Sequence, residues 1–516
     1  MLRLFRNLGR LVTIARTLAR HGALPVDMFA DSAPALALVL RAMNRSKAPG
    51  RRGQRLAAAL QELGPSFIKL GQVLSIRADL VGEEVAADLA QLRDRLPPFP
   101  GAQARAIIEA ELDRSLDQLF TKFDDQAVAA ASIAQVHFAE TPDGRLVAVK
   151  VLRPGIEIAF RRDLDLMLWL ARLLLRLQPR LRRLKPVEVV DTFARTVALE
   201  MDLRMEAAAA SELAENFEGD PTFAVPTIDW DRTAKGVMTQ ARVIGFSIDR
   251  LDDIRAAGLE PDVLLQHAAD AFFNQVFRDG FFHADMHPGN MFVTPAGKLV
   301  AVDFGIMGRI DRQTRLYLAD MLIGFLNRDY ELVARVHFDA GFVPADQDRE
   351  LFKQAVRSIG EPLHGRPLSD ISVGRLLAQL FAVTEKFQME TQPQLLLLQK
   401  SMLTAEGMGR VLNPHVNMWE LARPLIQRWM IENRGPEARI ANAAAAVAGI
   451  AVRLPSLVRD LEQTANLLAE GGGMKLHPES LALLSQAQAA ENRRQRRPLW
   501  AALALAAAAL LVLALK

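Results

Sequence analysis

The chain has 516 residues, too many for one simple hydrophobic core, so we expect two lobes or domains with extensions. Its 63 basic and 60 acidic residues give a net charge of +3, which argues against nucleic acid as the main partner. The absence of cysteine excludes disulfides, thiolate catalysis and cysteine-bound metals. The abundance of alanine and leucine predicts more helix than strand.

The N-terminal residues 1–20 contain five arginines and no acid, with apolar residues at helical spacing. Two interpretations stay open for this segment. One is a basic amphipathic helix on anionic lipid, and the other is an ordinary helix with a solvated face. Residues 31–120 predict further helices, broken by glycine and proline at residues 64–65, 97–98 and 100–101.

A β-hairpin is predicted around the turn Thr-Pro-Asp-Gly at residues 141–144, because apolar residues alternate on both sides of it: Val136 and Phe138 before it, and Val147, Val149 and Val151 after it. Lys150 lies between two of these valines. A lysine in such a place often solvates an edge strand. Here it precedes an Asp/Asn loop, as does the kinase lysine that holds the α- and β-phosphates. We therefore expect Lys150 to bind phosphate.

Acidic partners for Lys150 are expected on the helical segment 187–217, which contains Glu200, Asp202 and Glu206. Glu200 and Glu206 are six residues apart, so they do not share one face of a straight helix. This spacing predicts that the two glutamates have different partners. Asp202 and Glu206 do share a face.

The strongest motif is H-A-D-M-H-P-G-N at residues 283–290, followed by D-F-G at residues 303–305. It places Asp285, Asn290 and Asp303 in the order of a phosphoryl-transfer site. Asp and Asn supply the hard oxygen ligands that magnesium requires. After a short strand at residues 236–243, we expect long helices on both sides of this loop.

Downstream, residues 312–414 predict helices with a loop at residues 361–370. Residues 499–515 form an unbroken apolar run of 17 residues behind four arginines. This run predicts a membrane span with its basic side in the cytoplasm, or alternatively a tail that packs on a partner or lies in the interface.

Two further segments look ordinary by themselves and become informative only together with the motifs above. Before Lys150, the place of a glycine-rich phosphate loop is taken by Ala129, Ala130, Ala131 and Ser132, which predicts altered nucleotide handling. Upstream, K-L-G-Q at residues 69–72 would otherwise pass as a helix fragment.

Five spaced motifs together resemble the UbiB (ADCK-type) atypical kinase-like family, over about residues 60–415. They are G-P-S-F-I-K-L-G-Q at residues 64–72, A-A-A-S-I-A-Q-V-H at residues 129–137, V-A-V-K-V-x-R-P-G-I around Lys150, E-M-D-L-R-M-E-A from Glu200, and H-A-D-M-H-P-G-N with D-F-G.

The resemblance implies a role for each of these residues. Lys69 and Gln72 would belong to an extension that folds over the active site, held by Glu200 and Asp202. Glu206 would pair with Lys150, and Asp285 would take the catalytic-loop position. Magnesium would bind to Asn290 and Asp303.

The implied fold is α+β, a two-lobe protein-kinase-like domain with a helical N-terminal extension and a C-terminal transmembrane tail. We expect an extension at residues 1–120, an N lobe at 121–245 and a C lobe at 246–420. A helical region and linker at 421–492 and a basic flank and anchor at 493–516 would follow.

The implied function is support of ubiquinone biosynthesis by ATP-dependent handling of polyprenyl-phenol precursors or by regulation of the biosynthetic enzymes. Its cofactors would be ATP and Mg²⁺. Its partners would be membrane lipids, polyprenyl-phenol and quinone intermediates, and other enzymes of ubiquinone biosynthesis. Nucleic acid would not be a partner. The implied location is the bacterial inner membrane, with the catalytic domain in the cytoplasm.

Two departures affect this transfer. The expected hinge, residues 238–242, lacks an acidic residue, and the chain has one apolar tail segment where the family often has two. A small-molecule phosphotransferase of the aminoglycoside or choline kinase type and a catalytically silent nucleotide-binding scaffold stay as alternatives. A ring hydroxylase is disfavoured, since no dinucleotide fingerprint or facial-triad spacing occurs.

Overall fold

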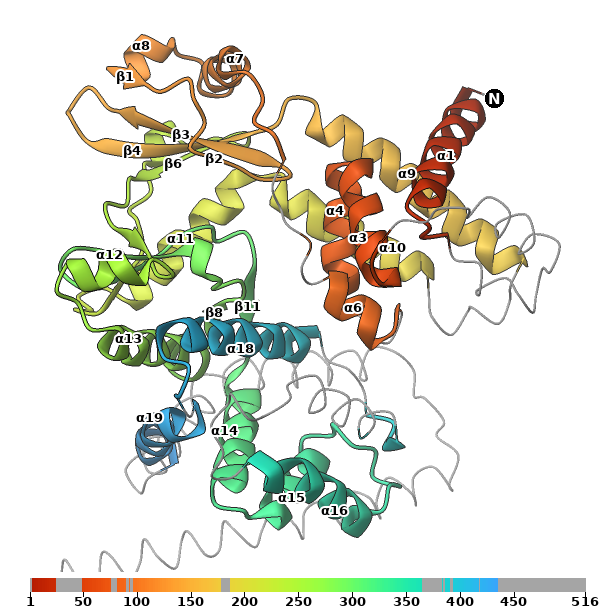
Figure 1. Ribbon diagram of the computed structural model, residues 1–516, viewed down its shortest axis with the longest axis vertical. Coiled ribbons are helices and arrows are strands. Elements are labelled where there is room, and N and C mark those ends of the chain that lie inside the picture. Colours follow the sequence, from red (N-terminus) through yellow and green to blue (C-terminus); the bar gives the residue numbers. More distant parts are fainter. Residues whose placement is uncertain are drawn as a thin grey trace, which may run out of the picture. The chain divides into compact units, whose positions relative to one another are not determined.

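The chain divides into two compact units, Met1–Ile431 and Glu432–Lys516. The helices and strands described below lie in the first unit, apart from the end of the last helix. Helices outnumber strands, which confirms the expected helix-rich α+β class (Figure 1). The computed structural model describes residues 2–24, 49–75, 81–89, 92, 96–177, 186–363, 383, 386–389, 393–416 and 418–434.

The predicted hairpin is present and forms the centre of the small-lobe sheet. Val149 and Val151 are buried against α7 (Gly101–Leu112) and α8 (Leu116–Leu119), so Lys150 between them points to the opposite face. Strand β4 pairs on both sides, so Lys150 lies on a central strand and not on an edge. The sheet has the order β1-β3-β4-β6, with β2 paired to β3: β1 Lys122–Phe123, β2 Ala129–Ala130, β3 Ala134–Glu140, β4 Leu146–Leu152 and β6 Val237–Ala241.

The helical segment that carries the acidic residues is broken where the two glutamates separate. Helix α10 ends at Glu200, and Asp202 is the N-cap of the next helix, where its side chain accepts a hydrogen bond from the Arg204 backbone N–H. Glu206 then lies in the first turn of that helix. The helices are α9 Ile156–Leu177, α10 Pro186–Glu200 and α11 Leu203–Asn216.

Short strands, and not long helices, follow the H-A-D-M-H-P-G-N loop, so the expectation of helices on both sides was wrong. Strands of three residues are too short to show any periodicity in the sequence. They form a sheet of order β5-β10-β9-β7 and a pair β11-β8. The elements are β5 Phe223–Ala224, η3 Trp230–Arg232, β7 Phe246–Ser247, α12 Leu251–Ala256, α13 Pro261–Phe273, η4 Asn274–Asp279, β8 Phe281–His283, η5 Pro288–Asn290, β9 Met291–Val293, β10 Leu299–Ala301 and β11 Met307–Arg309.

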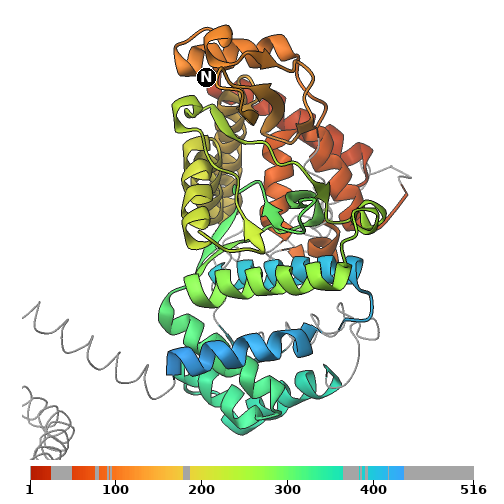
Figure 2. The ribbon, with the colours of Figure 1, turned by 90° about the vertical axis from the view of Figure 1, so that its left-hand side faces the viewer.

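The predicted helical region from residue 312 onward is confirmed where the structure describes it. Helix α18 runs beside α13 and contacts β11, which brings a late part of the chain next to the catalytic loop (Figures 1 and 2). The elements are α14 Arg312–Leu326, α15 Tyr330–Asp339, α16 Arg349–Gly360, η6 Glu361–Leu363, α18 Pro393–Leu412 and α19 Met418–Arg434.

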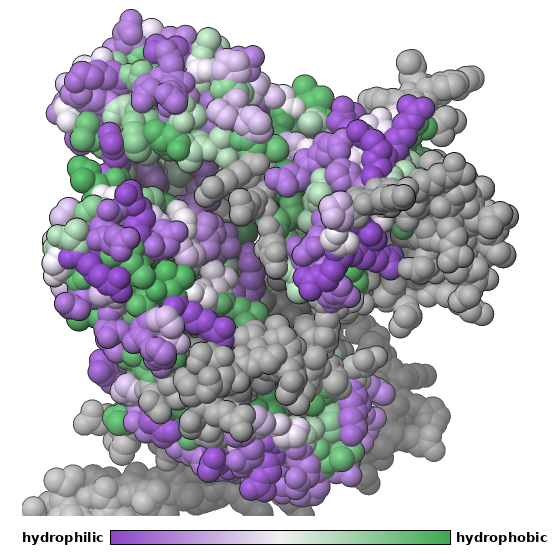
Figure 3. All heavy atoms as spheres, viewed as in Figure 1, coloured by the Kyte–Doolittle hydropathy of each residue, from purple (hydrophilic) through white to green (hydrophobic). Residues whose placement is uncertain are grey.

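The N-terminal helices pack on one another and on the helices α9 and α10. In α1, Ile14 is buried in the core, and Arg10 makes two hydrogen bonds of 2.9 and 3.0 Å to Asp163 of α9. This face of α1 is therefore covered by other parts of the protein. Neither of the two sequence interpretations included such packing. The helices are α1 Leu2–Arg20, α3 Arg52–Leu63, α4 Pro65–Ser75 and α6 Glu83–Leu89, and hydrophilic residues gather over the outer surface of α1 and α3 (Figure 3).

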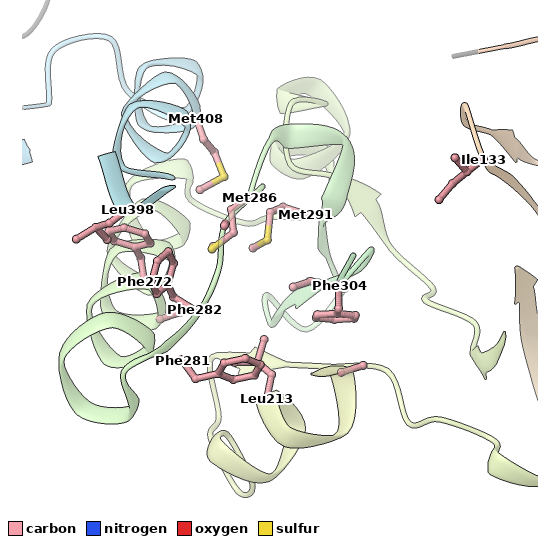
Figure 4. Packing of buried hydrophobic residues seen from close by; sticks show 14 of the residues in the cluster. Ile133, Leu213, Phe272, Phe281, Phe282, Met286, Met291, Phe304, Leu398 and Met408 are labelled. Atoms are coloured by element: carbon pink, nitrogen blue, oxygen red, sulfur yellow. The ribbon is translucent and has the colours of Figure 1, made fainter. Parts of the chain in front are cut away.

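The largest hydrophobic core includes residues of the N-terminal helices, α11, the catalytic loop and α18, while smaller separate clusters lie behind the small-lobe sheet and between α15 and α16. Leu398 of α18 lies against Phe272 of α13, and Met408 points toward Met286 of the catalytic loop (Figure 4). Phe304 of the D-F-G motif is buried in the same core. The core thus fixes the backbone around both acidic motifs.

None of the helices in the described ranges is long and apolar enough to cross a membrane. The predicted span at residues 499–515 lies outside those ranges.

Candidate active site

Lys150, Glu206 and Asp303 form an ion cluster between the two lobes. The Lys150 Nζ lies 2.6 Å from Glu206 Oε1 and 2.9 Å from Asp303 Oδ1. Lys150 and Glu206 are 14% and 8% exposed, while Asp303 keeps 49% of its side chain exposed. The cluster is therefore closed on the glutamate side and open on the aspartate side.

The charges in this cluster depend on one another. Burial alone would lower the pKa of Lys150, but the carboxylates of Asp303 and Glu206 raise it above its ordinary value. The Lys150 charge holds the pKa of Asp303 below its usual range, whereas burial raises the pKa of Glu206. Lys150 thus stays a cation and Asp303 an anion across the physiological pH range.

Asp303 also has an unusual backbone. Its φ of 65° lies in the left-handed region, which aspartate tolerates better than most residues. Backbone strain of this kind gathers at functional sites. Here it turns the chain between β10 and the buried Phe304, so that the Asp303 carboxylate reaches Lys150.

His283 links the catalytic loop to the strand that leads to Asp303. Its Nδ1 accepts a hydrogen bond of 3.1 Å from the Asp285 backbone N–H, and its Nε2 lies 3.1 Å from the Val302 carbonyl oxygen. Because Nδ1 accepts, the ring must be neutral and protonated on Nε2. Burial lowers the pKa of His283, which favours that neutral form, and the ring packs against Phe304.

Asn290 stands beside Asp285 at the end of the same loop. Its Nδ2 donates a hydrogen bond of 3.1 Å to the Asp285 carbonyl oxygen. That geometry assigns the amide nitrogen to the loop, so the amide oxygen is the atom that can ligate a metal. His287 fixes the turn between the two residues, because its Nδ1 accepts from the Gly289 N–H at 3.0 Å.

The oxygen donors fit a magnesium ion that is shared with phosphate. Mg²⁺ commonly takes one or two side-chain oxygens and fills its other positions with phosphate and water. Asn290 and Asp303 carry side-chain oxygens of this kind and would hold the ion together. Among the described residues, no group of three or more His, Cys, Asp and Glu side chains could hold a metal ion.

A helix of π type precedes the loop and was not predicted. In η4, Gln275 is fully buried, and its Oε1 accepts a hydrogen bond of 2.9 Å from the His283 backbone N–H. Such bulges recur at functional sites. Gln275 supports the strand that carries His283, a contact that no sequence pattern indicated.

Lys400 of α18 is the second residue that sequence reasoning missed. Its Nζ lies 3.1 Å from Asp285 Oδ1, and the two side chains are 34% and 28% exposed. His287 Nε2 lies 3.9 Å from the other oxygen of Asp285. The two residues of the ion pair are 115 positions apart, so no local spacing could reveal it.

The extension contacts the other glutamate. Lys69 Nζ of α4 lies 2.8 Å from Glu200 Oε2, and these side chains are 10% and 12% exposed. Glu200 and Glu206 thus have different lysine partners, as their spacing predicted. Asp202 pairs with Arg204 at 2.6 Å, so the contacts of its side chain lie at the start of α11. Gln72 lies half-buried one turn after Lys69 on α4.

The alanine-rich turn is held by its neighbours. Ala129 and Ala130 form β2, and the Ala131 carbonyl oxygen accepts hydrogen bonds of 3.0 and 2.9 Å from Arg153. Ser132 is fully buried. The expected hinge lies in and just after β6, where Met238 pairs with Lys150.

Comparison with known proteins agrees with this geometry. Residues 91–337 match the model of the ABC1 atypical kinase-like domain, and residues 356–417 match that of the UbiB helical domain. A protein of Marinobacter nauticus named "Probable protein kinase UbiB" is 44% identical over 466 residues, which cover 89% of this chain and 85% of that protein. A Pseudomonas aeruginosa protein of the same name is 44% identical over 406 residues, which cover 78% and 76%.

A solved structure supports the fold. The complex of Rv3197 with erythromycin from Mycobacterium tuberculosis covers 76% of this chain and 97% of its own, at 26% identity and a TM-score of 0.51. Both the domain matches and the identity over most of the chain point to one family. This chain belongs to the UbiB (ABC1) atypical kinase-like family.

Proposed function

We propose that this protein binds ATP with magnesium between its lobes and transfers the γ-phosphoryl group to water or to an acceptor hydroxyl, in support of ubiquinone biosynthesis. One observation carries the proposal. A buried lysine, Lys150, bridges Glu206 and the exposed carboxylate of Asp303. A cation and an oxygen ligand thus meet where a nucleotide needs both.

The residues would divide the chemistry among them. Lys150 would move from Asp303 to the α- and β-phosphates, while Glu206 keeps it oriented. Asp303 and Asn290 would hold magnesium, which neutralises charge on the β- and γ-phosphates.

Asp285 would accept the proton of the attacking oxygen. That oxygen forms a bond to the γ-phosphorus as the bond to the β–γ bridging oxygen breaks, and ADP leaves. The alanines at residues 129–131 lack the freedom of glycine and would restrict how the backbone covers the phosphates.

The contact of the N-terminal extension supports the proposal that only a restricted class of acceptor enters the site. Lys69 and Glu200 join α4 to the end of α10, six residues before Glu206. We propose that this contact, with Gln72 beside it, guards the cleft against protein substrates. A small or lipid-like acceptor at the membrane suits such a site, and the apolar run at residues 499–515 would anchor the chain there.

The test is phosphate release by the full-length chain, with and without anionic liposomes that contain a phenol mimic. Asp303→Asn should lower release at least about a hundredfold, because the metal ligand loses its charge. Asp348→Asn is the matched control, since Asp348 caps α16 and asparagine caps equally well.

The outcomes separate the candidate functions. Release that needs membrane and disappears only in Asp303→Asn supports the proposal. Release that is independent of membrane and depends on a soluble acceptor favours a small-molecule phosphotransferase. Nucleotide binding without any release favours a silent scaffold, and equal release by both variants contradicts the site.

A further inference from the structure

Lys400 contributes a positive charge to the acceptor side of the site. Its ion pair with Asp285, at 3.1 Å, connects two segments that match different family domains, the helical domain at residues 356–417 and the kinase-like domain at residues 91–337. One contact of the Asp285 carboxylate therefore comes from a helix outside the kinase-like domain.

The helix that carries Lys400 is firmly placed. Leu398 and Ser401 are buried on either side of it, and the Ser401 hydroxyl donates to the Leu397 carbonyl oxygen at 2.8 Å. Leu398 and Met408 share a core with Phe272, as Figure 4 shows. Lys400 thus extends toward the catalytic loop from a backbone that packing holds in register.

Stability does not explain this pair. Ion pairs that are about a third exposed contribute little to folding, because water screens them and the side chains lose conformational freedom. The other two lysines at the site already contact glutamates, Lys150 with Glu206 and Lys69 with Glu200. Lys400 contacts the aspartate that would receive the acceptor proton.

We propose that Lys400 is a positioning residue: it holds the Asp285 carboxylate on the acceptor side of the cleft and makes phosphoryl transfer depend on the docking of α18. This inference rests on the proposed function. Its physical reason is geometric, since a proton acceptor must lie within hydrogen-bond reach of the attacking oxygen, and small displacements slow the reaction strongly.

The experiment compares Lys400→Met, Lys400→Arg and a matched control in the full-length chain with liposomes. Lys353→Met is that control, because Lys353 also forms a pair of 3.1 Å, with Glu331 on α15, away from the catalytic loop. Lys400→Met should lower kcat about tenfold to a hundredfold while the KM for ATP and the Tm stay unchanged. Lys400→Arg should recover most of the rate, and Lys353→Met should keep it.

A double variant tests the coupling. If Lys400 acts through Asp285, then adding Lys400→Met to Asp285→Asn should cause no further loss of kcat. A wild-type kcat in Lys400→Met, or a full additional loss in the double variant, would overturn the inference. A parallel loss of Tm and kcat that arginine does not rescue would assign Lys400 a structural role instead, and would also overturn it.

A readout without turnover keeps the two proposals separate. Amide exchange of residues 283–290 in the nucleotide-free protein should be faster in Lys400→Met than in the wild type and in Lys353→Met. If the wild type neither binds ATP nor releases phosphate, the proposed function fails, yet this exchange still reports on Lys400. Unchanged exchange overturns the positioning role by itself.

Discussion

Two buried lysine–glutamate pairs use glutamates that lie six residues apart, Glu200 and Glu206, and the two pairs differ in their surroundings. Lys69–Glu200 and Lys150–Glu206 have similar distances, 2.8 and 2.6 Å, and similar burial. Lys150 also lies 2.9 Å from a second carboxylate, Asp303, whose side chain is 49% exposed. The first pair joins two helices, whereas the second keeps an anion available to a ligand.

The difference teaches how one kind of contact serves two purposes. A buried ion pair is costly to break, because the remaining charge has no water around it. When both partners are enclosed, as in Lys69–Glu200, the pair holds two helices together, and we call this pair the latch. When a third, exposed charge shares the lysine, the lysine can exchange that partner for a phosphate. Four predictions test this comparison.

Lys150→Met should have the largest effect. It leaves Glu206 buried without its cation, so we expect a loss of about 3–5 kcal/mol in the free energy of unfolding. It should also remove phosphate release. Thermal unfolding and a release assay measure the two effects.

The control for that variant is Lys122→Met. Lys122 also pairs with a glutamate, Glu140, at 2.7 Å, but its side chain is exposed on β1. It should leave both Tm and release unchanged. Equal losses in the two variants would mean that burial of the pair is irrelevant.

Lys69→Met should have the second-largest effect, because it removes the Lys69–Glu200 pair and leaves the contacts of Lys150 with Glu206 and Asp303 in place. We expect a loss of about 3 kcal/mol in the free energy of unfolding, at the lower end of the range for buried pairs, because Glu200 is slightly more exposed than Glu206. Amide exchange of residues 65–75 should become faster while ATP binding persists. Loss of ATP binding in this variant would show that the two pairs act as one.

Acidification should affect the catalytic side and spare the latch. Burial lowers the pKa of His283 in the folded protein, while an unfolded histidine titrates near 6.5. The folded loop needs the neutral ring, so its stability is present above about pH 6.5 and is lost as the pH falls below that value.

Amide exchange, corrected for the intrinsic rate at each pH, measures that change. Protection of residues 283–290 should fall between pH 7 and pH 5.5, and protection of residues 65–75 should stay constant. Uniform loss of protection across both segments would contradict the assignment to His283.

Asp202→Asn should have the smallest effect. Asp202 caps α11 and pairs with the exposed Arg204, which lowers its pKa, and asparagine caps a helix as well as aspartate does. We expect an unchanged Tm and unchanged exchange at residues 65–75. A loss comparable to that of Lys69→Met would place Asp202 in the latch beside Glu200.

Local pattern was sufficient for the half of the site near Lys150. Alternating valines placed Lys150 on a strand, and the six-residue spacing separated Glu200 from Glu206. The motifs H-A-D-M-H-P-G-N and D-F-G predicted that Asp285, Asn290 and Asp303 lie in one site. Each of these inferences uses residues that are close in sequence or joined by a known order of motifs.

Contacts between distant segments could not be predicted. Lys400 reaches Asp285 only because α18 packs beside α13, and Arg10 of α1 reaches Asp163 of α9 only because α1 packs on α3. No periodic pattern in the sequence indicates either of these packing contacts. The short strands after the catalytic loop were not predicted for another reason: three residues are too few to show an alternating pattern.

The most direct test of the central claim is a titration of the full-length chain with ATP and magnesium, followed by thermal unfolding. A ligand that binds only the folded state raises Tm with its concentration. The wild type and Asp348→Asn should show this rise, and Asp303→Asn should not. An equal rise in all three proteins, or none in the wild type, would contradict the account of Lys150 and Asp303 as the nucleotide site.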